Sequence, residues 1–157
     1  MATTLREKIM LVIEQRLANI SKSGGYSQDV RGVRRTISEM PDAPSLPYVF
    51  VYEDAEEKDP TYAVGVLRCT FSIVIVYLAT ANRDERTVAN AMLGDITKAI
   101  GDEISVTDAV GRNHCVVLDE AYNDVRYTSG SRPIIHVGVE YTVIYSHERG
   151  DQTQTSR

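Results

Sequence analysis

The order of helix-like and strand-like patterns predicts an α+β fold: a mostly antiparallel sheet of four to five strands with two helices packed on one face. Two amphipathic helical segments are separated by runs of strand patterns, which is typical of this class. The longest strand pattern is apolar at consecutive positions, as expected in the middle of a sheet. The chain has 157 residues, of which 43% are hydrophobic, and this is enough for one domain with its own core.

The first helix is predicted to begin at a capping box and to end at a glycine pair. Thr4 and Glu7 have the spacing in which each side chain satisfies a free amide of the first turn. Residues 21–25 end the helix, because paired glycines are poor helix formers. Between these ends the apolar residues recur at helical spacing: Leu5, Ile9, Val12, Ile13, Leu17 and Ile20.

Strands are predicted at residues 26–37, 48–52, 65–79, 114–127 and 133–146. Residues 38–47 hold three prolines and are predicted to be a connector. Residues 53–62 are predicted to be a mobile acidic loop, and chain that is neither helix nor strand is expected from the second helix to about Asn113. The acidic loop contains Glu53, Asp54, Glu56, Glu57 and Asp59.

The second helix is predicted to open at residues 82–86 and to close at Gly101. In the last strand, apolar residues alternate with His136, Gly138 and Glu140, so one face belongs to the core and the other lies in water or at an interface. Residues 147–157 hold no apolar side chain and are expected to be disordered in the isolated protein. The predicted organisation is therefore one domain over residues 1–146 and a flexible tail over 147–157.

Charge and cysteine content exclude several classes of protein. The net charge of −5 argues against a protein that grips nucleic-acid phosphates over its whole surface. Cys69 and Cys115 are too few for a disulfide scaffold and too far apart for a metal knuckle. No stretch approaches the ~20 apolar residues of a membrane span, and the first residues are not expected to act as a signal peptide. We expect synthesis in the cytoplasm and no membrane partner.

No catalytic or cofactor motif is present in the sequence. The phosphate-binding, dinucleotide-binding and serine-hydrolase glycine patterns are missing. Cys115 follows His114, but the nearby Asp119 and Glu120 oppose thiolate formation. The acidic loop lacks the ligand spacing of a calcium loop. We therefore expect no enzyme activity, no cofactor and no bound metal.

Arginine and tyrosine indicate an interaction surface. Thirteen of the 17 basic residues are arginine, and nine residues are tyrosine with no tryptophan. Both residue types are enriched at protein interfaces. Arg31, Arg34 and Arg35 lie together near a predicted strand. Two interpretations remain open: a basic edge strand that discourages aggregation, or ion pairs to the acidic loop of a neighbouring subunit.

The order of segments resembles the tail terminator, or tail completion, proteins of long-tailed bacteriophages over nearly the whole chain, to about Ser146. It begins with a helix ending in Leu-Ala-Asn-Ile, then Gly-Tyr-Ser-Gln-Asp-Val, an arginine-rich strand and a proline-bounded loop. The later segments that carry the resemblance are residues 47–51 with the acidic loop, the long strand ending in Tyr77, the helix around 89–96, and the strand 133–141.

This resemblance implies a non-enzymatic ring, usually of six subunits, in the virion at the head-proximal end of the tail tube. Such a ring ends tube polymerisation and joins the tail to the head connector, and it is assembled in the host cytoplasm. Its implied partners are other copies of the chain, the tube protein, a neck or connector protein and, in a contractile tail, a sheath protein. DNA passes through the bore without specific binding.

Three groups of residues are expected to serve the ring. Arg31, Arg34 and Arg35 are expected at the subunit interface. The acidic loop is expected to face the bore or the tube, or else to keep the outer surface soluble. A tail containing His147, Arg149 and Arg157 is expected to bind a partner. Two alternatives are a head–tail joining (neck) protein of similar fold and a small enzyme of unknown chemistry.

Overall fold

The computed structural model describes residues 3–35, 46–59, 66–80, 84–128, 134–148 and 150–151. The helices are α1 (Leu5–Ala18), the 3₁₀ helix η1 (Lys22–Gly24) and α2 (Glu85–Ile100). The strands are β1 (Gly32–Arg34), β2 (Tyr48–Asp59), β3 (Val66–Thr80), β4 (Glu103–Thr107), β5 (Asn113–Thr128) and β6 (Ile134–Glu148).

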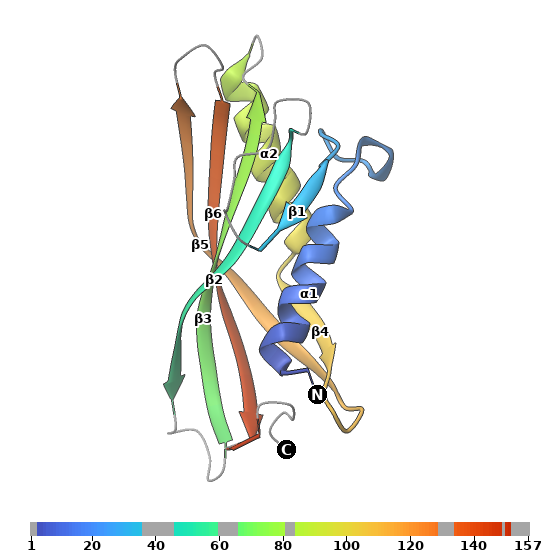
Figure 1. Cartoon of the computed structure of the whole chain (residues 1–157), viewed down its shortest axis with the longest axis vertical. Coiled ribbons are helices and arrows are strands. Elements are labelled where there is room, and N and C mark those ends of the chain that lie inside the picture. Colours follow the sequence, from blue (N-terminus) through green and yellow to red (C-terminus); the bar gives the residue numbers. More distant parts are fainter. Residues whose placement is uncertain are drawn as a thin grey trace.

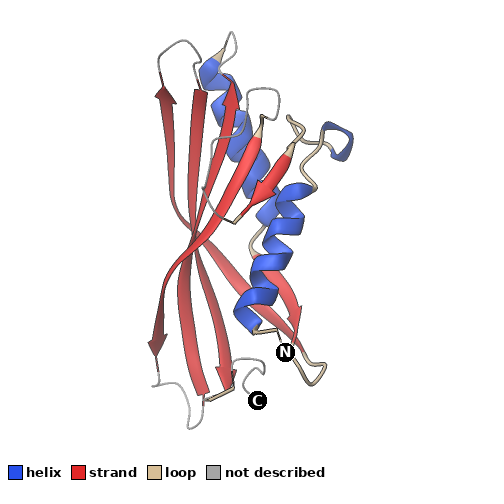
Figure 2. Cartoon of the chain, viewed as in Figure 1, coloured by secondary structure: helices blue, strands red, loops and turns tan. Residues whose placement is uncertain are grey.

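The six strands form a single twisted sheet in the order β1-β2-β3-β6-β5-β4. Every neighbouring pair is antiparallel except β1 with β2. Helices α1 and α2 lie on the same face of the sheet, and no helix of the described residues lies on the opposite face (Figures 1 and 2). The predicted α+β class, the mostly antiparallel sheet and the position of both helices are confirmed. The sheet has six strands in the described part of the chain, whereas four to five are predicted.

The core lies between the helices and the sheet face that they cover. In β6, alternate side chains from Ile135 to Tyr145 are buried on this face, which confirms the predicted alternation. From α1, Leu5, Ile9 and Ile13 are completely buried against them. We call this surface the helix side, and the other surface the open face.

Both helices begin at a side-chain cap. Thr4 accepts a hydrogen bond from the backbone N–H of Glu7 at 3.2 Å, as the capping box predicts. The Glu7 carboxylate, however, pairs with Arg35 and does not complete the box. Asp84 caps α2 by accepting from the backbone N–H of Thr87, and Gly101 ends that helix with a φ of 66°, which favours glycine.

The strand predicted over residues 26–37 is wrong for most of its length, because only Gly32–Arg34 form β1. The preceding residues are held to α2 by side chains instead of by a strand ladder. Asp95, which is buried, accepts hydrogen bonds from the backbone N–H and the hydroxyl of Ser27. Lys98 lies 4.5 Å from the ring centre of Tyr26. These side-chain contacts with α2 take the place of strand pairing in this segment. Residues 36–45, most of the predicted connector, lie outside the described part of the chain.

The acidic loop predicted from residue 53 is also wrong, because β2 continues to Asp59. Glu53 pairs with Ile73 of β3, and after a bulge Glu56 pairs with Phe71. Glu53 pairs with Arg35, which follows β1, and Glu56 lies 3.7 Å from Arg6 of α1. Two of the five carboxylates that favour a loop are therefore neutralised in a strand, an effect of tertiary structure that composition does not show.

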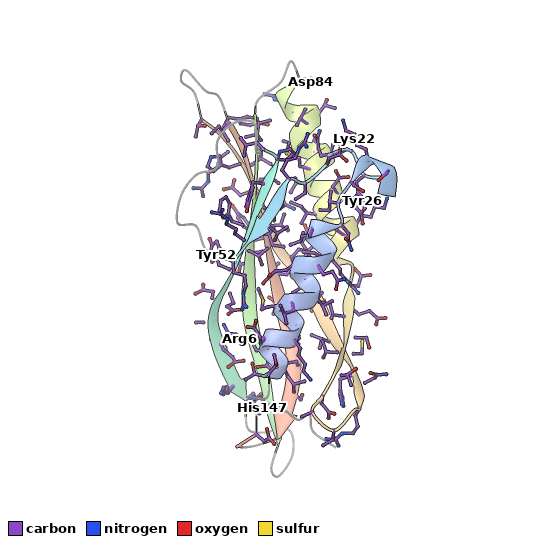
Figure 3. All side chains as sticks on the ribbon, turned by 45° about the vertical axis from the view of Figure 1, so that its right-hand side comes forward. Arg6, Lys22, Tyr26, Tyr52, Asp84 and His147 are labelled. Atoms are coloured by element: carbon purple, nitrogen blue, oxygen red, sulfur yellow. The ribbon has the colours of Figure 1, made fainter. Side chains whose placement is uncertain are left out.

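Two further boundaries differ from the predictions. Residues 103–107, expected to be irregular, form β4, in which Ile104 and Val106 are buried and their neighbours are exposed. The prediction that His147 belongs to the flexible tail is wrong, because His147 lies in β6 and is buried (Figure 3). The sheet thus extends to Glu148. Arg149 and residues 152–157 lie outside the described residues.

Candidate interaction surface

The open face carries a grid of polar and aromatic residues set by the strand pairing. Because paired residues of neighbouring strands lie on the same face of a sheet, the register brings distant segments into rows across β2, β3, β6 and β5. Three successive rows have these members on β2, β6 and β5: Tyr48, His136 and Arg126; Phe50, Gly138 and Asp124; Tyr52, Glu140 and Tyr122.

A hollow of about 250 Å³ lies in the middle of this grid. Tyr52 and Tyr122 stand on opposite sides of it, with 36% and 60% of their surfaces exposed. Gly138 contributes no side chain to its floor, and the nearest atom to a Cβ built there would be 3.9 Å away. Figure 3 shows Tyr52 on the side of β2 that faces away from α1. The hollow is therefore open to a side chain from another molecule.

The hollow has one carboxylate in excess. Asp124 accepts from Nε of Arg126 at 2.5 Å, so their charges balance. Glu140 forms no hydrogen bond or ion pair with any residue that the structure describes. Burial and the positive charge of Arg126 lower the pKa of His136, so this side chain is neutral at ~pH 7. The Nε2 atom of His136 is buried and has no partner among the described residues. The site favours a cation.

The three arginines predicted at the subunit interface lie in or beside the edge strand β1, but they do not share one surface. Arg34 is exposed, and its guanidinium carbon lies 5.6 Å from the ring centre of Tyr48. Arg31 is also exposed, and neither arginine forms an ion pair within the described chain. Arg35 points to the helix side instead. Arg31 and Arg34 remain for the predicted interface, whereas Arg35 belongs to a charge cluster inside the chain.

That cluster joins one guanidinium to three carboxylates. Arg35 donates to Glu7 from Nη1 at 2.6 Å and to Glu53 from Nη2 at 2.9 Å. Its Nε lies 3.2 Å from Glu14. Burial raises the pKa of Glu14, and the charge of Arg35 opposes the rise. The cluster connects α1, the end of β1 and β2, which is a structural role.

Tyr48 rests directly on Gly32, and this contact supports a prediction. A Cβ built at Gly32 would lie 2.4 Å from the Tyr48 ring, so Gly32→Ala must displace the ring that Arg34 stacks on. We expect Gly32→Ala to lower the free energy of unfolding, measured in urea, by about 1 kcal/mol. Gly94→Ala is the control, because a Cβ there meets nothing within 4 Å and α2 should gain about 0.5 kcal/mol or more. Equal changes in the two variants would contradict the proposed contact.

Of the five acidic residues predicted to face the bore or the tube, some are bound within the chain and the others are exposed. Glu56 accepts from the Tyr145 hydroxyl at 2.5 Å and lies 3.7 Å from Arg6, near the start of α1 (Figure 3). Glu53 belongs to the Arg35 cluster. Asp54, Glu57 and Asp59 are exposed. Of the five, these last three are the exposed carboxylates.

Cys115 and His114 do not interact as a nucleophile and its base. Adjacent residues of a strand point to opposite faces, and His114 lies 3.5 Å from Asp108. The Cys115 thiol donates to Glu103 at 3.1 Å, which raises the pKa of the thiol and disfavours the nucleophilic thiolate. Among the described residues, no group of three or more His, Cys, Asp or Glu could hold a metal ion. Neither described helix is long and apolar enough to cross a membrane.

The sequence prediction missed Tyr52, Tyr122 and Glu140 as members of one site. The alternation of the last strand did indicate a second face in water or at an interface, and Glu140 lies on that face. The tyrosines join it only through the pairing of β2 and β5 with the centre of the sheet. In comparisons with known proteins, the sequence matches no family model and no curated protein significantly.

Proposed function

We propose that the chain is a structural protein of a phage virion, whose copies form a ring at the head-proximal end of the tail tube. The ring ends tube polymerisation and joins the tail to the neck or connector. The observation that carries this proposal is the presence of two different free patches on one chain: the open-face hollow and the arginine edge of β1. A closed ring requires such a heterologous contact, in which one patch meets a different one.

The composition of both patches supports assembly rather than catalysis. Tyrosine and arginine combine large contact areas with directed hydrogen bonds, and they dominate energetic centres of interfaces. The layout of segments that resembles tail terminator proteins supplies the tail as the setting. In this proposal the tube protein and the neck protein bind the two ends of the ring, and no cofactor is used.

Ring formation is tested by measuring the mass of the purified protein by light scattering and by imaging it in negative stain. We expect a hollow ring, in keeping with the six subunits that the resemblance implies. Co-expression with the tail tube protein of the same phage should give tubes that carry the ring at one end only. A compact monomer at all micromolar concentrations, with tubes left uncapped, would overturn the proposal.

The exposed acidic residues of β2 give a second test. If they face the bore, they repel DNA and leave it mobile. Replacing Asp54 and Glu57 by lysine should create binding to duplex DNA that weakens steeply with salt, because bound phosphates release counterions. Fluorescence anisotropy measures the affinity. Lysine at Asp102 and Asp119, which are also exposed, makes the same charge change elsewhere. Equal DNA binding by both variants would contradict the proposal that the acidic residues of β2 in particular keep DNA mobile.

A further inference from the structure

We infer that the open-face hollow is a socket for an arginine side chain from the β1 edge of a second copy of this chain. The inference rests on the proposed ring and deepens it, because it names the two surfaces that meet. Three features of the hollow lead to it: its charge, its aromatic sides and its missing side chain at Gly138.

Charge selects a cation. Glu140 is the carboxylate without a partner among the described residues, while Asp124 and Arg126 already neutralise each other. His136 adds no positive charge when neutral. A cation that enters the hollow gains an ion pair with Glu140 at a place partly shielded from water, where such a pair is stronger than at an open surface.

Shape and aromatic content select a guanidinium. Tyr122 pairs directly with Glu140, and Tyr52 stands in the same row on the far side of β3. Three interstrand spacings of about 4.8 Å separate Tyr52 from Tyr122, so the gap between their backbones is roughly 14 Å. A planar guanidinium can stack on a tyrosine ring while it donates two hydrogen bonds to a carboxylate. Gly138 in the next row leaves room for the stem of the side chain.

The β1 edge offers the complementary group. Arg31 and Arg34 are exposed and have no ion pair within the described chain, and Tyr48 supports the Arg34 guanidinium. Arg34 cannot reach the hollow of its own chain. Arg34 pairs with Phe50 on β2, and Gly138 in the same row lies on β6, three interstrand spacings or roughly 14 Å from the backbone of Arg34. The two patches are therefore separate on one chain and can meet between two copies.

The test is reversal and exchange of charge, with mass measured by light scattering over a dilution series. Glu140→Arg and Arg34→Glu should each raise the dissociation constant of the assembly by about tenfold or more. Glu140→Gln, which keeps the shape, should also weaken assembly. The double variant carrying Glu140→Arg and Arg34→Glu should recover most of the loss. Asp102→Arg and Arg86→Glu are matched controls at exposed positions outside the two patches, and they should assemble as the unchanged protein does.

Each outcome separates the inference from the proposed function. A ring that tolerates Glu140→Arg, with an unchanged melting temperature, overturns the socket and leaves the ring proposal standing. Loss of assembly in both single variants without recovery in the double variant also overturns it, because the two charges then do not meet. A two-subunit particle that depends on Glu140 and Arg34 supports the socket and refutes the ring. An unchanged protein that stays monomeric refutes both.

Discussion

Replacing Arg35 by methionine should lower the free energy of unfolding by about 2 kcal/mol at ~pH 7. The substitution keeps much of the alkyl stem but leaves Glu7, Glu14 and Glu53 facing one another without a cation. The magnitude lies between that of exposed and buried ion pairs, because about a third of the Arg35 side chain is exposed. Chemical denaturation in urea gives the measurement.

The loss should shrink as the pH falls. Burial already raises the pKa of Glu14 above its ordinary value, and removal of Arg35 takes away the charge that opposes this rise. The folded variant then holds the Glu14 proton more tightly than the unfolded chain does, so stability relative to the unchanged protein returns as the pH falls through that pKa. If Arg35→Met lowers the free energy of unfolding equally at ~pH 7 and ~pH 4, the loss comes from packing and not from the unpaired carboxylates. Arg34→Met, one residue away and exposed, should change stability by less than about 0.5 kcal/mol.

Phe50→Ala should have the larger effect, a loss of about 3 kcal/mol in the free energy of unfolding. Phe50 lies on the open face, yet only 1% of its surface is exposed, because Leu46, Tyr48 and Ile134 cover it. Its ring centre is 5.2 Å from that of Tyr48. Truncation therefore leaves a cavity in a small second core. The same denaturation experiment measures the change.

Tyr52→Ala is the matched control for Phe50→Ala, two residues further along the same face of β2. Because Tyr52 is more than a third exposed, its loss should cost less than about 1 kcal/mol. If both variants lose the same stability, the second core does not exist as described. If the inferred socket is correct, Tyr52→Ala should instead weaken assembly while leaving the monomer fold intact.

The fold class could be predicted from local periodicity because the helix stripes and the alternation of β6 are encoded in neighbouring residues. The extension of β2 could not be predicted in this way. Its carboxylates favour a loop, and two of them, Glu56 and Glu53, are neutralised by Arg6 and Arg35, which are distant in sequence. The short strand β4 gives only two buried positions, Ile104 and Val106, too few to distinguish it from irregular chain.

The interaction surface shows the same division between local and tertiary information. The sequence predicts an arginine-rich edge, but only the sheet shows that Arg34 faces outward while Arg35 joins α1. The hollow depends on strand register: Tyr122 is placed beside Glu140 by the pairing of β5 with β6, and Tyr52 enters the same row through the pairing of β2 with β3 and of β3 with β6. Sequence periodicity assigns a residue to a face of its own strand, and it does not assign the residue across from it.

The central pairing of the sheet also determines when the chain can fold during its synthesis. β3 pairs with β6 along its whole length, from Thr80 with Ile134 to Val66 with Glu148, so all partners are more than 50 residues apart. Because β6 is the last strand that the structure describes, the middle of the sheet cannot close until residues 134–148 have left the ribosome. Until then β3 has an unpaired edge that is prone to aggregation. Chains terminated before Ile134 therefore lack the centre of the sheet and should be degraded or aggregate before they can compete with complete chains for assembly.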